Sequence, residues 1–185
     1  MPKKDRSKSF AKKGRIRAAR VSDYFEISSM AGEIFAPYGD YTQVLPGYLL
    51  VPSVRTFVYE IRNDLVGFIQ VHVDQQQLQD DPILSADILS AAVSPRHQGK
   101  GLGTALFQHV FQWLRPLSSS VDFARVLLTV AHTNHRAMRF FRRMGFSLDG
   151  EELGTYSGGQ RALRMSRRLS MAGSDGPQNP DNQDP

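Results

Sequence analysis

The sequence predicts an α/β (mixed α+β) fold in which one central mixed sheet is flanked by helices. Two short apolar runs, at 86–93 and 124–131, are typical of buried strands. A segment with apolar residues at helical spacing follows each run, so strands and helices alternate along the chain. Further strand patterns at 55–73 and 162–169 complete the predicted sheet.

The first half of the domain begins with a short strand at 15–20 and a helix after it. Ser22 or Asp23 is suited to cap the N-terminus of this helix. Its apolar residues recur at helical spacing: Ile27, Met30, Ala31 and Ile34. The aromatic residues, prolines and glycines of 35–49 predict a turn and a short helix.

Residues 55–73 form two predicted strands about a turn at 62–64, and the polar segment 74–82 predicts a loop. The helix after the 86–93 strand has an apolar face made by Leu102, Ala105, Leu106, Val110, Trp113 and Leu114. We expect Pro116 to stop this helix.

A second helix follows the 124–131 strand, and Gly145 is expected to cap its C-terminus. Its apolar residues are Ala137, Phe140, Phe141 and Met144. The strand predicted at 162–169 is the last element of the domain.

Charge divides the chain into a basic arm, a nearly neutral body and an acidic tail. The net charge is +5, but residues 1–17 hold eight Lys or Arg and one Asp, and residues 171–185 hold three Asp and no base. The body, residues 18–170, therefore carries +1. We expect a flexible basic arm at 1–13, a folded domain at 14–170 and a disordered tail at 171–185.

The composition excludes several classes of protein. The chain has no cysteine, which excludes a disulfide framework and a thiol nucleophile. No run approaches the ~20 apolar residues that a membrane helix needs, and the N-terminus is charged, unlike a signal peptide. We therefore expect a cytoplasmic protein without membrane contact. The basic arm would allow weak nucleic-acid contact through residues 1–17, although most such arms are only solvated.

The stretch SPRHQGKGLGTAL, residues 94–106, places three glycines within five positions at the start of a helix. A helix N-terminus has unpaired N–H groups and a partial positive charge, so it favours an anion such as phosphate. The glycines carry no side chain that would keep an anion from the backbone, and Arg96 and Lys100 add positive charge. These glycines are Gly99, Gly101 and Gly103.

Three phosphate-binding patterns compete for this stretch. A P-loop needs G-x-x-x-x-G-K-[ST], and it fails because Gly101 follows Lys100. A dinucleotide fingerprint needs G-x-G-x-x-G, and it fails because Thr104 stands in the last position. The pattern Q/R-x-x-G-x-G/A fits, with Gln98, Gly101 and Gly103. Through this pattern the sequence resembles the GNAT acetyltransferase superfamily, whose members bind the pyrophosphate of acetyl-CoA with this turn.

A second motif argues against the alternative of a glycine-rich turn that binds nothing. The segment LLTVAHTNHRAMRFFRRMGF, residues 127–146, is similar to the family's N-x-x-A-[hydrophobic]-x-x-[aromatic]-x-x-x-G-F. The matching residues are Asn134, Ala137, Met138, Phe141, Gly145 and Phe146. The resemblance runs from Arg15 to about Leu169, closest in pattern to the ribosomal-protein alanine and N-terminal acetyltransferase branch. It implies the GNAT fold, with a sheet splayed into a V between the strands that end near Val93 and Ala131.

The resemblance implies acetyl-CoA as co-substrate and a set of residues that hold it. Main-chain groups of Ala91, Ala92 and Val93 would bind the pantetheine arm. Asn134 would approach the cofactor from the end of the next strand, with Phe141 on the same side. Backbone amides of the turn would hold the pyrophosphate: Gln98, Gly99, Lys100, Gly101, Leu102, Gly103 and Thr104.

The acid and base positions of the family depart from its pattern. Phe141 stands where relatives usually have a Tyr that protonates the leaving thiolate, and Thr129 stands where ribosomal-protein alanine acetyltransferases have a Glu. The histone-acetyltransferase branch places a basic Glu eleven residues before Gln98, and this chain has Asp87 there. Asp87 is one methylene shorter, so it would act as base through a water; the alternative is a solvated carboxylate at a strand start.

The segment TYSGGQRALRM, residues 155–165, is similar to the acceptor segment of N-terminal acetyltransferases, although Thr155 and Arg161 depart from it. The resemblance gives Tyr156 contact with the acceptor or the role of a displaced acid; the alternative is a packed hairpin residue. Three residues of the 35–49 segment, Tyr38, Asp40 and Tyr41, either close over the acceptor, with Asp40 attracting its ammonium group, or only pack a helix turn.

The sequence therefore predicts an acetyl-CoA-dependent N-acetyltransferase that moves an acetyl group directly to a primary amine. The acceptor is a protein or peptide α-amino group or a small-molecule amine. The alternative is a non-catalytic acyl-CoA-binding sensor, which Phe141 and Thr129 favour. We expect no metal, because His132 and His135 have no third ligand at a supporting spacing. The protein is expected to be a monomer or homodimer.

Overall fold

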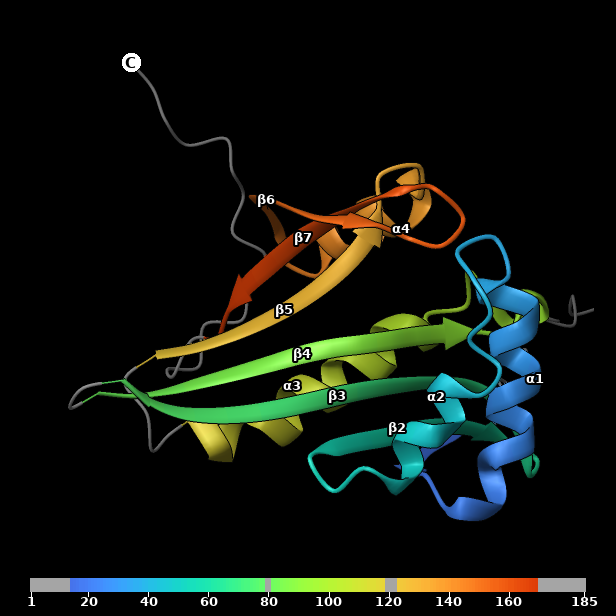
Figure 1. Ribbon diagram of the computed structural model, residues 1–185. Helices are drawn as coiled ribbons and strands as arrows, with labels where there is room; N and C mark the ends of the chain where they lie inside the picture. Colours follow the sequence, from blue (N-terminus) through green and yellow to red (C-terminus); the bar gives the residue numbers. More distant parts are fainter. Residues whose placement is uncertain (1–13, 79–80, 119–122, 170–185) are drawn as a thin grey trace, which may run out of the picture.

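The computed structural model describes residues 14–78, 81–118 and 123–169, in which seven strands form one sheet with helices on both faces (Figure 1). The strands are β1 (Arg15–Ala18), β2 (Val54–Ile61), β3 (Asp64–Leu78), β4 (Asp81–Val93), β5 (Phe123–Ala131), β6 (Ser147–Thr155) and β7 (Arg161–Arg168). The helices are α1 (Tyr24–Phe35), α2 (Val44–Gly47), α3 (Leu102–Ser118) and α4 (His135–Arg143), with short 3₁₀ turns η1 (Val21–Asp23), η2 (Tyr48–Leu50) and η3 (Pro95–His97). The predicted arm, 1–13, and tail, 171–185, lie outside the described residues.

The strand order is β1-β2-β3-β4-β5-β7-β6. Neighbouring strands are antiparallel, with one exception. Strands β4 and β5 are parallel, and α3 connects them. The predicted single mixed sheet flanked by helices is therefore confirmed.

The sheet opens between its two parallel strands. β4 and β5 pair only from Ile83 with Phe123 to Ile88 with Leu128. Beyond these positions β4 runs on to Val93 and β5 to Ala131, and Figure 1 shows the two strands diverging. Unpaired main-chain N–H and C=O groups need hydrogen-bond partners, so the opening offers them to a ligand.

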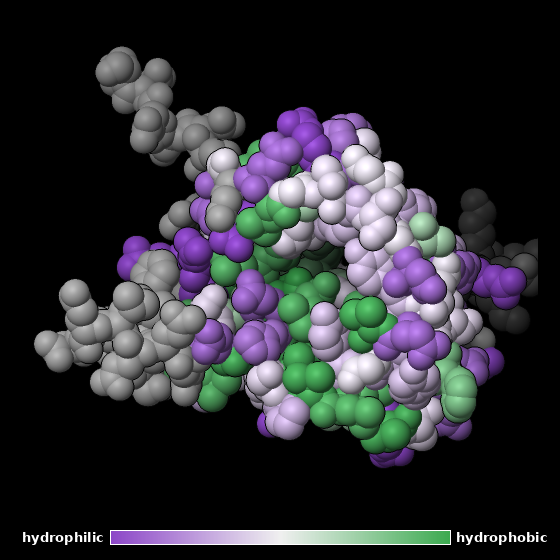
Figure 2. Space-filling view, viewed as in Figure 1, coloured by the Kyte–Doolittle hydropathy of each residue, from purple (hydrophilic) through white to green (hydrophobic). Residues whose placement is uncertain are grey.

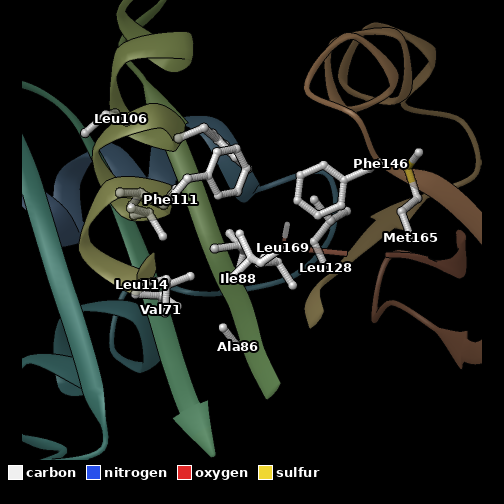
Figure 3. Packing of buried hydrophobic residues seen from close by; sticks show 14 of the residues in the cluster. Val71, Ala86, Ile88, Leu106, Phe111, Leu114, Leu128, Phe146, Met165 and Leu169 are labelled. Carbon is white, nitrogen blue, oxygen red and sulfur yellow. The ribbon is translucent and has the colours of Figure 1, made fainter. Parts of the chain in front are cut away.

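Helices α3 and α4 cover one face of the sheet, and α1 with α2 covers the other (Figure 1). On the first face, Phe111 and Leu114 of α3 pack over Ile88, and Phe146 reaches the same cluster from the other half of the sheet (Figure 3). On the second face, apolar residues of α1 and α2 meet Val58, Phe68 and Ala92. The helical residues of that cluster are Ile27, Met30, Ala31 and Leu45, three of which the spacing in 24–35 predicts.

The polar segment 74–82 is not the predicted loop. β3 continues to Leu78 and β4 begins at Asp81, with a regular antiparallel register between them. A two-stranded ladder is held by main-chain hydrogen bonds, so it forms without the alternating apolar residues by which a strand is recognised in a sequence.

Two further expectations about the elements are corrected. Helix α3 continues past Pro116 to Ser118. A proline this close to a helix end removes one hydrogen bond without disrupting several turns. Strand β6 was not expected, because SLDGEELGT contains charged residues and two glycines, which are depleted in strands.

Asp23 occupies the N-cap position of α1, but its carboxylate does not accept from a helix amide. It accepts from the Arg20 amide (2.6 Å) and from both terminal nitrogens of Arg17 (2.8 Å each). Arg17 also donates to Glu60 on β2 (2.7 Å). The guanidinium of Arg17 lowers the pKa of Asp23, so a charge network fixes β1 against the start of α1 in place of the predicted side-chain cap.

Candidate active site

The turn after β4 has an open backbone. Gly99 and Gly101 have φ of +75° and +81°, a region in which an L side chain is strained. A Cβ atom added at either position would meet no other heavy atom within 4 Å. The conformation therefore requires glycine here, and the space above the turn is free for a ligand.

The amides of this turn form a row of available donors. Within the described part of the chain, the amides of Gly99, Lys100 and Gly101 donate to no protein acceptor. Helix α3 starts at Leu102, and the amides of a first helical turn have no partner inside the helix. Such a row beside a helix N-terminus matches the oxygens of a diphosphate.

The side chains around the turn hold its shape. Gln98 donates from Nε2 to the Val93 carbonyl (2.9 Å), and Lys100 donates from Nζ to the Arg96 carbonyl (2.8 Å). A hydrogen bond of 2.8 Å joins Ser94 Oγ to His97 Nδ1. Gln98 therefore holds the turn against the end of β4, while the glycines leave the main-chain amides of the turn uncovered.

Gly103 has a different role from the other two glycines. A Cβ atom there would lie 3.5 Å from the ring of Phe140 on α4, which is contact distance. The first turn of α3 therefore lies beside α4, which belongs to the second motif.

A cleft of about 140 Å³ lies between the two halves of the sheet, and Figure 2 shows it as a hollow in the molecular surface. Six of the candidate site residues line it: Tyr38, Tyr41, Ala91, Asn134, Phe141 and Tyr156. Several other residues that line the cleft have no functional role predicted from the sequence, among them Phe35, Leu45, Leu89 and Ser90. These come from α1, α2 and the middle of β4, and no local motif marks them.

Ala92 and Val93 lie next to the cleft without lining it. Ala92 is buried in the cluster under α1, and the Val93 side chain packs on the α3 face. Main-chain groups of successive strand residues point to opposite edges, so those of Val93 face the open edge of β4, where its carbonyl accepts from Gln98, while Ala92 pairs with Phe68 on β3. The predicted main-chain contacts to a pantetheine arm stay a prediction.

Asp87 lies in the closed part of the sheet. It is half-buried, pairs with His72 on β3 and Leu127 on β5, and immediately precedes Ile88, which lines the cleft. Its carboxylate is not part of the cleft wall, so its predicted work as a base would pass through a water.

Three tyrosines line the cleft: Tyr38, Tyr41 and Tyr156. The rings of Tyr38 and Tyr156 are 5.5 Å apart. Burial, and then the neighbouring phenols of Tyr41 and Tyr38, raise the pKa of Tyr156 to about 12. The Tyr156 hydroxyl therefore stays protonated at neutral pH, where it can donate a proton but cannot act as a base.

The loop after α1 meets the β6–β7 turn across the cleft. The Gly158 amide donates to the Tyr38 carbonyl (3.2 Å), and Gln160 Nε2 donates to the Pro37 carbonyl (2.9 Å). Asp40 lies outside the cleft: its carboxylate accepts from the amide and hydroxyl of Thr42 and lines a separate open cavity of about 420 Å³. The tyrosines of this loop, and not its carboxylate, face the cleft.

The histidines of the second motif have structural contacts. His132 Nδ1 accepts from the Arg161 amide (3.0 Å), and its own amide donates to the Arg161 carbonyl (2.9 Å). Among the residues that the structure describes, no group of three His, Cys, Asp or Glu is close enough to hold a metal ion. Over the same residues, each helix is too short or too polar to cross a bilayer.

Residues 21–146 match the Acetyltransferase (GNAT) family, which covers more than half of the chain. The protein therefore belongs to the GNAT acetyltransferase family, as its two motifs indicate.

Two curated relatives are similar to parts of the chain. Streptothricin acetyltransferase of Streptomyces lavendulae is 33% identical over 119 residues, which are 60% of this chain and 57% of that protein. Spermine/spermidine N(1)-acetyltransferase of Bacillus subtilis (strain 168) is 30% identical over 88 residues, 48% of this chain and 56% of that protein. The chain thus spans little more than half the length of these relatives.

The fold is also similar to solved structures. NAA60 of Arabidopsis thaliana, in complex with a bisubstrate analogue, matches with a TM-score of 0.71 and 18% identity over 85% of this chain and 100% of that one. The complex of the same protein with acetyl-CoA matches with a TM-score of 0.70 and 19% identity over 85% and 99%. At this identity the likeness shows the fold alone.

Proposed function

We propose that the protein is an acetyl-CoA-dependent N-acetyltransferase that moves an acetyl group directly to a primary amine. The turn after β4 supports this most directly: its uncovered amides, fixed by left-handed glycines, suit the diphosphate of CoA. The unpaired edge of β4 leads from the turn to the cleft, so a thioester at the end of the pantetheine arm would reach the cleft.

The reaction needs no covalent enzyme intermediate. The ammonium group of the acceptor first loses a proton, and its nitrogen then attacks the acetyl carbonyl carbon. The new C–N bond forms, the C–S bond breaks, the nitrogen gives up its second proton to the base or to water, and the CoA sulfur leaves as a thiolate or takes up a proton. A thiol has a pKa near ~8.5, so full protonation of the sulfur is not required.

Tyr156 is our candidate for the acid that Phe141 cannot supply. Both residues line the cleft, and the Tyr156 phenol keeps its proton at neutral pH. A hydroxyl donor beside the leaving sulfur would stabilise the thiolate by a charge-assisted hydrogen bond. Asp87 is our candidate base, acting through a water.

The character of the cleft favours an amine of low basicity. None of the described residues that line it is a carboxylate, so an arriving ammonium group meets tyrosine hydroxyls and ring faces instead. A lysine-like amine (pKa ~10.4) costs roughly 3.5 kcal/mol more to deprotonate at neutral pH than an α-amino group (pKa ~7.8). We therefore expect a peptide α-amino group or a small-molecule amine, and the two curated relatives are named for small-molecule acceptors.

Two measurements test this function. A thermal-shift titration compares acetyl-CoA with desulfo-CoA; both should raise the melting temperature, and no shift at saturating dose would show that the turn holds no CoA. Release of free CoA is then followed against peptides, polyamines and amino acids. Binding without turnover on any amine would favour the acyl-CoA sensor over the enzyme.

A further inference from the structure

Three buried polar residues form a row across the sheet beneath α2. Thr56 on β2, Gln70 on β3 and Ser90 on β4 are paired in register, so their side chains lie on the same face. Gln70 has no exposed surface, and the other two are less than one tenth exposed. The next row on this face toward α1, Val58, Phe68 and Ala92, is apolar, and buried polar side chains need hydrogen-bond partners.

The Gln70 amide joins the two walls of the cleft. Its Nε2 donates to the Leu45 carbonyl on α2 (2.8 Å) and to Thr56 Oγ1 (3.1 Å), and its Oε1 accepts from Ser90 Oγ (2.8 Å). Leu45 and Ser90 both line the cleft, whereas Gln70 and Thr56 do not. Gln70 is thus a buried strut with one end on the acceptor wall and the other on the strand expected to hold the thioester.

The two cleft residues that Gln70 contacts, Ser90 and Leu45, each adjoin a feature that shapes the cleft. Ser90 follows Leu89, the extra residue at which the β3–β4 register shifts and after which β4 separates from β5. Leu45 donates its amide to the Tyr41 carbonyl (3.2 Å), so the same residue that Gln70 holds also fixes a cleft tyrosine. A change at Gln70 would therefore move the bulge, the tyrosine or both.

We propose that Gln70 is a positioning residue that couples the thioester-holding part of β4 to the acceptor wall formed by α2 and Tyr41. This inference rests on the proposed acetyl transfer for its kinetic consequences, but the coupling itself does not depend on turnover. An apolar side chain in its place removes the buried partner of Ser90 Oγ and one of the two donors to the Leu45 carbonyl, which otherwise accepts from the Tyr48 amide, and it leaves the two walls unconnected.

Gln70→Leu and Thr56→Val separate coupling from packing. Gln70→Leu removes all three hydrogen bonds, and kcat/KM for the acceptor should fall at least about 30-fold while the Kd of acetyl-CoA changes less than about 3-fold. Thr56→Val removes the one bond that does not reach the cleft, and both quantities should stay within about 3-fold of wild type. Equal acceptor kinetics in Gln70→Leu and wild type, or equal losses in the two variants, would overturn the proposal.

Gln70→Glu supplies a readout that a merely structural role would not move. Burial raises the pKa of a glutamic acid above its ordinary ~4.3, and the protonated acid can both donate to the Leu45 carbonyl and accept from Ser90. The ionised form cannot donate. The ratio of acceptor KM in this variant to that of wild type should therefore be near one at low pH and rise as pH passes the raised pKa, whereas the same ratio for Gln70→Leu should not change with pH. A flat difference across pH would count against the coupling.

Hydrogen exchange tests the coupling without any acceptor. Acetyl-CoA binding should slow exchange of the α2 amides, including those of Leu45 and Gly47, in wild type and in Thr56→Val, but not in Gln70→Leu. If wild type acetylates no amine yet shows this pattern, the proposed function fails and the strut stands. If wild type turns over and α2 responds equally in all three proteins, the strut fails and the function stands.

Discussion

The proposed cofactor turn and the proposed acceptor cleft are built in opposite ways. The turn is a single run of chain, residues 93–104, and it offers main-chain amides. The cleft draws its wall from α1, the loop after it, β4, β5, α4 and the β6–β7 turn, and it offers side chains. A turn made of backbone can keep one shape in many proteins, whereas a wall made of side chains from several segments can change one residue at a time.

Strand β4 connects the turn to the cleft, and its pairing changes along its length. Before Leu89 it is an ordinary inner strand, paired on both sides. After Leu89 it keeps only β3 as a neighbour, and it then enters the turn. The bulge is thus where a structural strand becomes part of a binding site, and changes on its two sides should have separable effects.

The largest effect is expected at the candidate base, just before the bulge. Asp87→Asn should lower kcat by about 100-fold or more with little change in the Kd of acetyl-CoA, because the variant keeps the shape of the side chain and removes its basicity. Steady-state kinetics and a binding titration measure the two quantities. Asp64→Asn, at the exposed β2–β3 turn, is the control. An unchanged kcat in Asp87→Asn would show that Asp87 is not the base.

A change in the turn should give the converse result. Gly101→Ala should raise the Kd of acetyl-CoA by about 30-fold, because a Cβ atom strains the left-handed backbone and covers the amides. Isothermal titration measures the affinity. Gly150→Ala is a matched control: Gly150 has φ of +72° and the same open surroundings, but it lies in β6 away from the turn. Similar losses of affinity in both variants would mean that the turn is not the binding site.

A smaller effect is expected at the phenol in the cleft. Tyr156→Phe should lower kcat by about 10-fold and leave the Kd of acetyl-CoA unchanged, since a thiolate can leave without a full proton transfer. With the pKa of Tyr156 at about 12, wild-type activity should show no alkaline loss from this group below about pH 10. Tyr59→Phe, outside the cleft, is the control. An unchanged kcat in Tyr156→Phe would show that Tyr156 is not the acid and that the leaving sulfur takes its proton from solvent.

The two regions also differ in how far the sequence could predict them. Gly99 and Gly101 are informative on their own, because a positive φ is a property of the local chain. Asn134 and Phe141 follow from the second motif in the same way, and both line the cleft. The opening between β4 and β5 was predictable only from the family resemblance, because no local sequence pattern specifies where two parallel strands separate.

The acceptor wall could not be predicted in the same way. Tyr38 and Tyr156 are more than one hundred residues apart in the chain and meet only because the α1–α2 loop reaches the β6–β7 turn. Strand β6, which carries that turn, has a composition unlike a strand. Gln70 lies in a strand pattern as one polar residue among apolar ones, and only the register across β2, β3 and β4 gives it three partners.

The smallest effect tests whether the support of the acceptor wall is separate from the turn. Asp23 is held by Arg17 where β1 meets α1, and Asp23→Asn should lower the free energy of unfolding by about 2 kcal/mol at pH 7 while leaving the Kd of acetyl-CoA unchanged. Because Arg17 lowers the pKa of Asp23, this stabilisation is present above the unfolded pKa of ~3.9 and is lost as pH falls through the folded value. Urea unfolding at pH 7 and below pH 4 should therefore show a gap between wild type and variant that closes in acid. A gap of constant size would assign the effect to packing instead of charge, and a weakened acetyl-CoA complex in the variant would show that the two regions do not respond independently.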